Sequence, residues 1–257
     1  MTQASFDPRT DGFSFINYWT LDDVLTQDIR NKMNAAVDGV STFLAAVPYL
    51  SILRPFILRT VNDWVKKAST QAYGLCGGMA FAALDYYVSG RNLPGDKGPT
   101  SNLSPVLRDY IVKRMKDSFW YLQDGTLHNN LARVLAWMAI RQYAPFGHGP
   151  GLLLNWSQAE FNKLNDLIAR NGAWPIALIG ESTDPCENHQ VLAYECESRG
   201  EQGVIHIYDM NHPGAGRSIN LNFHGPALEG MGEFAGDTWQ PLRAFFCEEY
   251  SPAVPPL

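Results

Sequence analysis

A cysteine between glycines is the residue of this 257-residue sequence best suited to nucleophilic chemistry. Cys76 lies between Gly74 and the pair Gly77-Gly78, where a loop gives way to a long apolar run. Glycines at such a point permit positive φ angles or let another segment approach the backbone closely. A helix beginning at Cys76 would set free N–H groups and a partial positive charge beside the sulfur, which favours the thiolate. Cys76 is therefore a candidate nucleophile, and a buried structural cysteine is the alternative.

A nucleophilic cysteine needs a base, and His189 is the histidine best placed to supply one. It opens residues 189–196, a run typical of a strand, after the turn-like stretch 182–185. A histidine at the mouth of a strand projects from the end of the sheet, where it is accessible to a cysteine on another element. The alternative is a histidine that only packs or forms a structural hydrogen bond.

A predicted hairpin brings a third residue to His189. Residues 189–196 and 204–209 read as two strands joined by a polar stretch. With the turn centred on residues 199–201, the numbers of facing residues add up to about 400, which sets Asp209 and Asn211 beside His189. A carboxylate or amide next to the imidazole fixes its tautomer and supports the imidazolium. Both Asp209 and Asn211 remain candidates for this role.

The elements that must position these residues are helices first and strands afterwards. Capping signals in residues 20–23 and helical periodicity after them predict a first helix that runs to about residue 44. The same signals predict the helices 55–68, 76–87, 105–121, 127–142 and 157–171, the last with a capping box at Ser157 and Glu160. Apolar runs between turn residues predict the strands 174–179, 189–196 and 204–209, with 217–223 and 242–246 as further candidates. This order predicts an α+β fold. We expect one domain, residues 1–257, in which a helical subdomain (1–172) packs on an antiparallel sheet subdomain (173–250) with an active-site cleft between them.

The order cysteine, histidine, acid or amide, together with this layout, resembles the papain-like cysteine peptidases, in particular their C39-like group. The motifs that carry the resemblance are Gly74-Leu75-Cys76-Gly77-Gly78-Met79, Asn188-His189-Gln190-Val191-Leu192, and Tyr208-Asp209 with Asn211. They cover roughly residues 70–90 and 175–215, and the double-cysteine signature of papain and the cathepsins is absent. The resemblance implies a papain-like fold and makes Gln71, a few residues before the cysteine, the oxyanion donor.

These residues predict a thiol-dependent hydrolase or acyltransferase, most simply a cysteine peptidase or amidase acting on a peptide or another amide-containing substrate. The alternative function is a papain-like scaffold that binds a partner while its triad is idle. A second, weaker chemistry is a metal site. Cys186, His189, Asp209 and His212 have the spacing of a four-ligand set if the hairpin brings them together. The leading interpretation needs no cofactor and no metal.

Composition excludes several other classes. The formal net charge is −6 and no cluster of Lys and Arg is present, so a nucleic-acid partner is not expected. Four cysteines in a chain of this length do not form a disulfide framework. Neither a signal peptide nor a membrane-spanning run is visible, so we expect no stable membrane insertion and, by default, a cytoplasmic location. The oligomeric state is left open.

Overall fold

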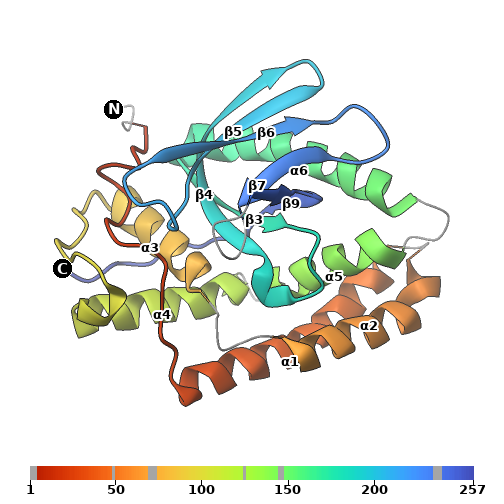
Figure 1. Cartoon of the computed structure of the whole chain (residues 1–257), viewed down its shortest axis with the longest axis horizontal. Coiled ribbons are helices and arrows are strands. Elements are labelled where there is room, and N and C mark those ends of the chain that lie inside the picture. Colours follow the sequence, from red (N-terminus) through yellow and green to blue (C-terminus); the bar gives the residue numbers. More distant parts are fainter. Residues whose placement is uncertain (1–4, 48–49, 69–73, 124–125, 144–147, 234–238) are drawn as a thin grey trace.

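The helices of the chain precede its main sheet, which confirms the predicted α+β class. The computed structural model describes residues 5–47, 50–68, 74–123, 126–143, 148–233 and 239–257. The helices are α1 (Asp23–Ala45), α2 (Arg54–Lys67), α3 (Cys76–Val88), α4 (Pro105–Phe119), α5 (Asn130–Tyr143) and α6 (His148–Asn171). Figure 1 shows α1 and α2 below α5, with the sheet above.

The main sheet is antiparallel throughout and curled. Among the described residues it has seven strands in the order β8-β7-β6-β5-β4-β3-β9. They are β3 (Trp174–Ile179), β4 (His189–Arg199), β5 (Gln202–Tyr208), β6 (Gly216–Asn222), β7 (Glu229–Glu233), β8 (Trp239–Pro241) and β9 (Ala244–Cys247). A separate hairpin of β1 (Trp120–Gln123) and β2 (Thr126–Asn129) connects α4 to α5.

Different helices cover the two faces of this sheet. On one face α6 contributes Phe161 and Leu164, which share a buried cluster with Ile176 of β3 and Val191 of β4. On the opposite face α3 packs along β4, and Leu192 belongs to the larger core shared with the N-terminal helices. Burial of both faces explains why β3 and β4 are apolar at successive positions rather than alternating.

The predicted hairpin has the predicted register. β4 and β5 pair Leu192 with Tyr208 and Arg199 with Gln202, so the partner numbers add up to about 400. A bulge between Ala193 and Glu195 shifts the pairing by one residue along the way. Because the register holds at the open end of the hairpin, the start of β4 and the residues just after β5 lie at the same end of the sheet.

α1 begins at Asp23 and is capped by Asp22, which lies within the predicted capping stretch 20–23, and the Asp22 carboxylate accepts from the Leu25 N–H at 2.8 Å. The predicted start of the last helix is wrong. α6 begins at His148, nine residues before the predicted capping box. Ser157 lies inside that helix and is buried, and its Oγ accepts from the Phe245 N–H at 3.3 Å. The hydroxyl therefore ties α6 to β9 instead of capping a helix. The strands β7 and β8 are absent from the prediction.

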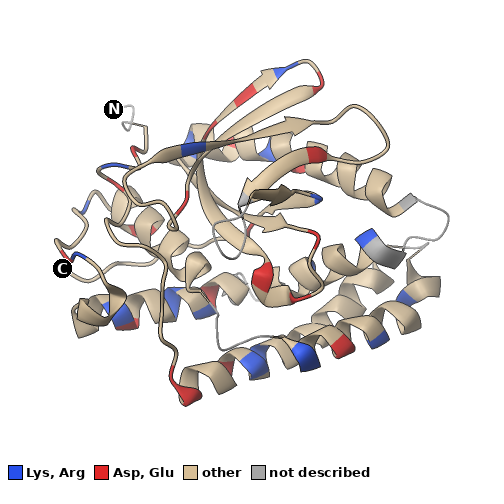
Figure 2. Cartoon of the chain, in the orientation of Figure 1, with Lys and Arg blue, Asp and Glu red and all other residues tan. Residues whose placement is uncertain are grey.

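Charged residues of both signs lie along the helices. Figure 2 shows Lys and Arg interspersed with Asp and Glu on α1, α2 and α4. Lys116 of α4 pairs with Asp28 of α1 at 2.6 Å, which joins two helices that are far apart in the sequence. None of the described helices combines the length and the apolar character that a membrane crossing requires.

Candidate active site

α3 carries Cys76 as its first residue and is buried almost all round. Most of its residues are apolar, and every residue from Cys76 to Tyr86 is buried. The two glycines after the cysteine have helical backbones, so close packing and not positive φ explains them. A Cβ at Gly78 would overlap the Ile111 carbonyl oxygen of α4, and a Cβ at Gly77 would overlap the Gln190 amide oxygen. The glycines therefore let α4 and β4 approach the first turn of α3.

The structure brings Cys76, His189 and Asp209 together. His189 Nε2 and Asp209 Oδ1 are 2.9 Å apart, and both side chains are almost completely buried. Cys76 lines the same cavity as His189, and its interaction with the imidazole is one of the causes that raise the pKa of His189. A carboxylate can only accept, so Nε2 carries a proton toward Asp209, and Nδ1 is the ring nitrogen left to interact with the sulfur. Sulfur, imidazole and carboxylate therefore lie next to one another in that order.

Electrostatics favour a charged His189. Burial disfavours the imidazolium, but the negative charge of Asp209 and the hydrogen bonds to Asp209 and Cys76 outweigh it. The pKa of His189 is therefore raised well above its ordinary value. A histidine that keeps its proton beside a cysteine is the partner with which a thiolate forms an ion pair.

The two other predicted site residues have different positions. The backbone N–H of Asn211 donates to Asp209 Oδ1 at 2.9 Å, so Asn211 supports the carboxylate. Of the two candidates for the group that orients the imidazole, Asp209 is the one whose side chain contacts the ring. Gln71, the predicted oxyanion donor, lies outside the described residues.

The N-terminal segment links the two halves of the site. Asn17 Oδ1 accepts from the Leu75 N–H at 2.9 Å, directly before Cys76. The backbone N–H of Asn17 donates to the Met210 carbonyl at 2.9 Å, directly after Asp209. Nothing in the local sequence around residue 17 indicates this bridge, because it joins three segments that are distant along the chain.

Two further polar residues, not predicted from the sequence, line the cavity at the sulfur. Cys76 Sγ donates to Gln190 Oε1 at 3.8 Å, and Gln190 Nε2 donates to Glu248 Oε1. Glu248 is completely buried, and burial raises its pKa to about 8. Gln190 follows His189 directly, a proximity that the sequence displays, whereas no local signal connects residue 248 with residue 76.

The cavity itself is small. At the position where a cleft was expected, the described residues enclose about 30 Å³, a volume that holds one or two water molecules. Cys76, His189, Gln190 and Glu248 belong to its polar lining, and Leu131 belongs to its apolar lining. Cys76 is 8% exposed and His189 is 5% exposed, so access to the sulfur is narrow.

The other three cysteines are free and have no such surroundings. Burial raises the pKa of the Cys196 thiol to about 12, and it raises the pKa values of Cys186 and Cys247 further. In the described part of the chain, no three His, Cys, Asp or Glu side chains are grouped so that they could hold a metal ion. The alternative metal site built on Cys186 and His212 is therefore not assembled there.

Comparisons of the chain with family models, with curated proteins and with solved structures gave no match. What the fold establishes is thus the α+β class, with helices followed by a curled antiparallel sheet. The resemblance to papain-like proteins rests on the motifs around Cys76, His189 and Asp209.

Proposed function

We propose that this protein is a thiol-dependent hydrolase or acyltransferase that acts on an amide bond. The observation that carries the proposal is that Cys76 lies in one cavity with His189, which interacts with it and is hydrogen-bonded to Asp209. A nucleophile beside a base that a third group orients is the arrangement on which acyl transfer through a covalent intermediate depends.

The reaction follows from this geometry. His189 takes the thiol proton, and the thiolate of Cys76 attacks the carbonyl carbon of the substrate amide. The N–H groups of the first turn of α3 offer hydrogen bonds to the developing oxyanion. The protonated His189 then gives its proton to the leaving amine, and a thioester remains on Cys76. Water attacks the thioester in a hydrolase, and a second amine attacks it in an acyltransferase, with His189 again as base.

Selective alkylation tests the proposal. The intact protein is treated with iodoacetamide at pH 7, and the modification of each cysteine is followed by peptide mass spectrometry. We expect Cys76 to react at least about 10-fold faster than the other three, because the thiolate is the nucleophile and their raised pKa values keep them protonated. A rate at Cys76 no higher than at Cys196 contradicts an activated thiol.

A binding scaffold with an idle triad is the second candidate function. The observation that favours it is the narrow access to the sulfur, with Cys76 only 8% exposed and a cavity of about 30 Å³. Turnover of a panel of short peptide amides, measured for the intact protein and for Cys76→Ala, separates the two. Turnover that the variant loses supports the enzyme. Tight binding of a peptide by both forms, with turnover in neither, supports the scaffold.

A further inference from the structure

Gln190 touches both the candidate nucleophile and a buried acid. Its Oε1 accepts from Cys76 Sγ at 3.8 Å, and its Nε2 donates to Glu248 Oε1. The amide is held against the first turn of α3, since a Cβ at Gly77 would overlap Oε1. A primary amide has an oxygen that accepts and a nitrogen that donates. Whether Glu248 accepts or donates a hydrogen bond therefore determines which of these two atoms faces the sulfur.

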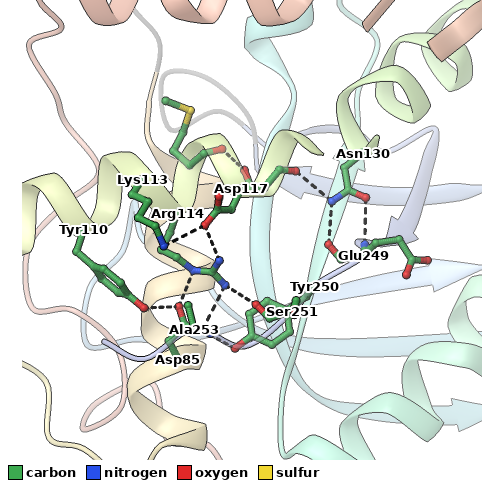
Figure 3. A network of polar contacts seen from close by, with 12 residues as sticks. Asp85, Tyr110, Lys113, Arg114, Asp117, Asn130, Glu249, Tyr250, Ser251 and Ala253 are labelled. Carbon is green, nitrogen blue, oxygen red and sulfur yellow. Dashed lines mark hydrogen bonds and ion pairs between the residues drawn. The ribbon is translucent and has the colours of Figure 1, made fainter. Parts of the chain in front are cut away.

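The backbone at Glu248 is fixed from both sides. Its N–H donates to the Pro175 carbonyl at 3.0 Å, and its carbonyl accepts from Trp174 Nε1 at 2.9 Å, so β3 holds it. The next residue, Glu249, exchanges hydrogen bonds of 3.0 and 3.1 Å with the Asn130 side chain of α5 (Figure 3). The backbone from which the Glu248 side chain extends into the cavity is therefore held in place.

The Glu248 carboxyl group is incompletely satisfied. Its Oε2 is buried and has no hydrogen-bond partner among the described residues. An ionised carboxylate with a bare oxygen in a buried site is unfavourable, which is why burial raises the pKa of Glu248 to about 8. The hydrogen bond from Gln190 and the positive charge of Arg133 lower it only in part.

The charged groups near Glu248 do not cancel the increase in its pKa. Arg133 of α5 is itself paired with Glu160 of α6 and lies over the rings of Trp137 and Phe246. Lys163 of α6 pairs with Glu249, the neighbour of Glu248. Among the described residues, the titratable and charged groups that face Glu248 are Cys76 of α3 and His189 of β4, which line the same cavity, and Arg133 of α5. Glu160 and Lys163 of α6 stand one step further away, paired with Arg133 and Glu249.

We infer that Gln190 acts directly on the reacting sulfur and that Glu248 is a positioning residue that selects which end of the Gln190 amide faces Cys76. This inference rests on the proposed function, because it requires Cys76 to be the nucleophile. An ionised Glu248 can only accept, so Gln190 must turn Nε2 toward it, and Oε1 then faces Cys76 and favours the thiol. A protonated Glu248 can donate to Oε1, which turns Nε2 toward Cys76, where it stabilises the thiolate or a substrate oxyanion.

The consequence is an unusual pH dependence. An ordinary thiol reacts faster with alkylating agents as pH rises, because more thiolate forms. Cys76 should instead lose reactivity as pH rises through about 8, where Glu248 ionises and the amide turns its oxygen to the sulfur. Cys196, on the same molecule, should show the ordinary rise.

The experiment is the rate of alkylation of Cys76 by iodoacetamide, resolved by peptide mass spectrometry from pH 6 to pH 10. For the unmodified chain we expect a fall of roughly 10-fold, the size expected when a hydrogen bond to a charged group is lost. Glu248→Gln cannot ionise and should keep the fast rate at all pH values. Gln190→Leu has no amide and should keep the slow rate. Glu249→Gln, the matched control, should retain the fall.

Each outcome decides the matter. A rate at Cys76 in the unmodified chain that simply rises with pH overturns the inference without any variant. A fall that persists in Glu248→Gln overturns the role of that acid, and unchanged rates in Gln190→Leu overturn the role of the amide. The two variants act independently, so a folding failure of one, seen by circular dichroism, leaves the other decisive. If Cys76 reacts no faster than Cys196 at any pH, the proposed function itself fails.

Discussion

At the scale of single residues, the site pairs two buried carboxyl groups with different neighbours. Asp209 Oδ1 accepts hydrogen bonds from the imidazole of His189 and from the Asn211 N–H. The Glu248 carboxyl group accepts from the Gln190 amide, and its other oxygen has no hydrogen-bond partner among the described residues. Asp209 therefore raises the pKa of the imidazole beside it, whereas burial raises the pKa of Glu248 itself to about 8.

Replacing Asp209 by Asn tests the first of these roles. The amide keeps the shape but not the charge, so the main cause that raises the pKa of His189 is lost. We expect the pKa of His189, followed by NMR of the imidazole protons, to fall toward or below its ordinary value. The rate of Cys76 alkylation at pH 7 should fall by about 100-fold, near the upper end of what the loss of a hydrogen bond to a charged group costs.

A second histidine–carboxylate pair provides the control for that experiment. His206 Nε2 lies 3.0 Å from Glu197 on the same hairpin, but this pair is partly exposed and far from the sulfur along β4. Glu197→Gln should leave both the His189 titration and the Cys76 rate unchanged. If Asp209→Asn behaves like Glu197→Gln, the carboxylate has no part in activating the thiol.

At the scale of elements, the sequence predicts the features that depend on residues close together in the chain. The glycines around Cys76 predicted the start of α3, and the register of the β4–β5 hairpin predicted that His189 and Asp209 are neighbours, because nearby residues set both features. The start of α6 was missed because the Ser157 hydroxyl is used by a strand amide 88 residues further on. For the same reason no pattern indicated that Glu248 would reach Gln190.

Gly77→Ala tests whether the first turn of α3 must lie against β4. A Cβ there would overlap the Gln190 amide oxygen and Ser118 Oγ, so either the amide or the helix has to move. Overpacking of this kind costs about 1–3 kcal/mol, which exceeds the gain in helix propensity from replacing glycine. We expect urea unfolding to show that loss, and we expect the rate of Cys76 alkylation to change with it.

Gly151 of α6 is the matched helical glycine. A Cβ there would meet only the Pro226 carbonyl, at 3.4 Å, which is close to ordinary contact. Gly151→Ala should therefore be neutral or slightly stabilising, and it should leave Cys76 unchanged. Equal effects of the two substitutions would show that helix propensity, and not the contact with β4, governs this position.

At the scale of the whole molecule, a buried ionic network holds the C-terminal segment against the helices (Figure 3). Asp85 of α3 is completely buried and accepts from Arg114 at 2.6 Å, from the hydroxyls of Tyr110 and Tyr250 at 2.8 Å each, and from the Ala253 N–H at 2.8 Å. Tyr250 and Ala253 follow Glu248 closely in the chain. The network therefore helps to fix the C-terminal segment that carries Glu248, the acid in the cavity wall.

Asp85→Ala should destabilise the protein by about 3–5 kcal/mol, because it leaves the Arg114 charge buried without its main partner. Asp117 offers the comparison, since it pairs with the same arginine at 2.8 Å but is one-third exposed. Asp117→Asn should lose less than about 1 kcal/mol. The free energies of unfolding in urea give both values, and similar losses for the two variants would contradict the importance of burial.

The N-terminal segment makes the corresponding link on the other side of the site. Asn17 connects the residue before Cys76 with the residue after Asp209, although the three segments are distant in sequence. Its side chain also accepts from Trp19 Nε1 at 3.0 Å, so the carboxamide oxygen serves two donors. A bridge of this kind sets the distance between the sulfur and the acid that orients the imidazole.

Asn17→Ala removes the oxygen and leaves the backbone bond to Met210 in place. The Leu75 N–H then loses its acceptor directly before the nucleophile, so we expect Cys76 alkylation at pH 7 to slow by roughly 10-fold while stability falls by only about 1–2 kcal/mol. Asn62→Ala is the control, because that exposed amide only donates to a carbonyl of its own helix α2. An unchanged Cys76 rate in Asn17→Ala, together with a normal loss of stability, would mean that the two halves of the site hold their distance without this bridge.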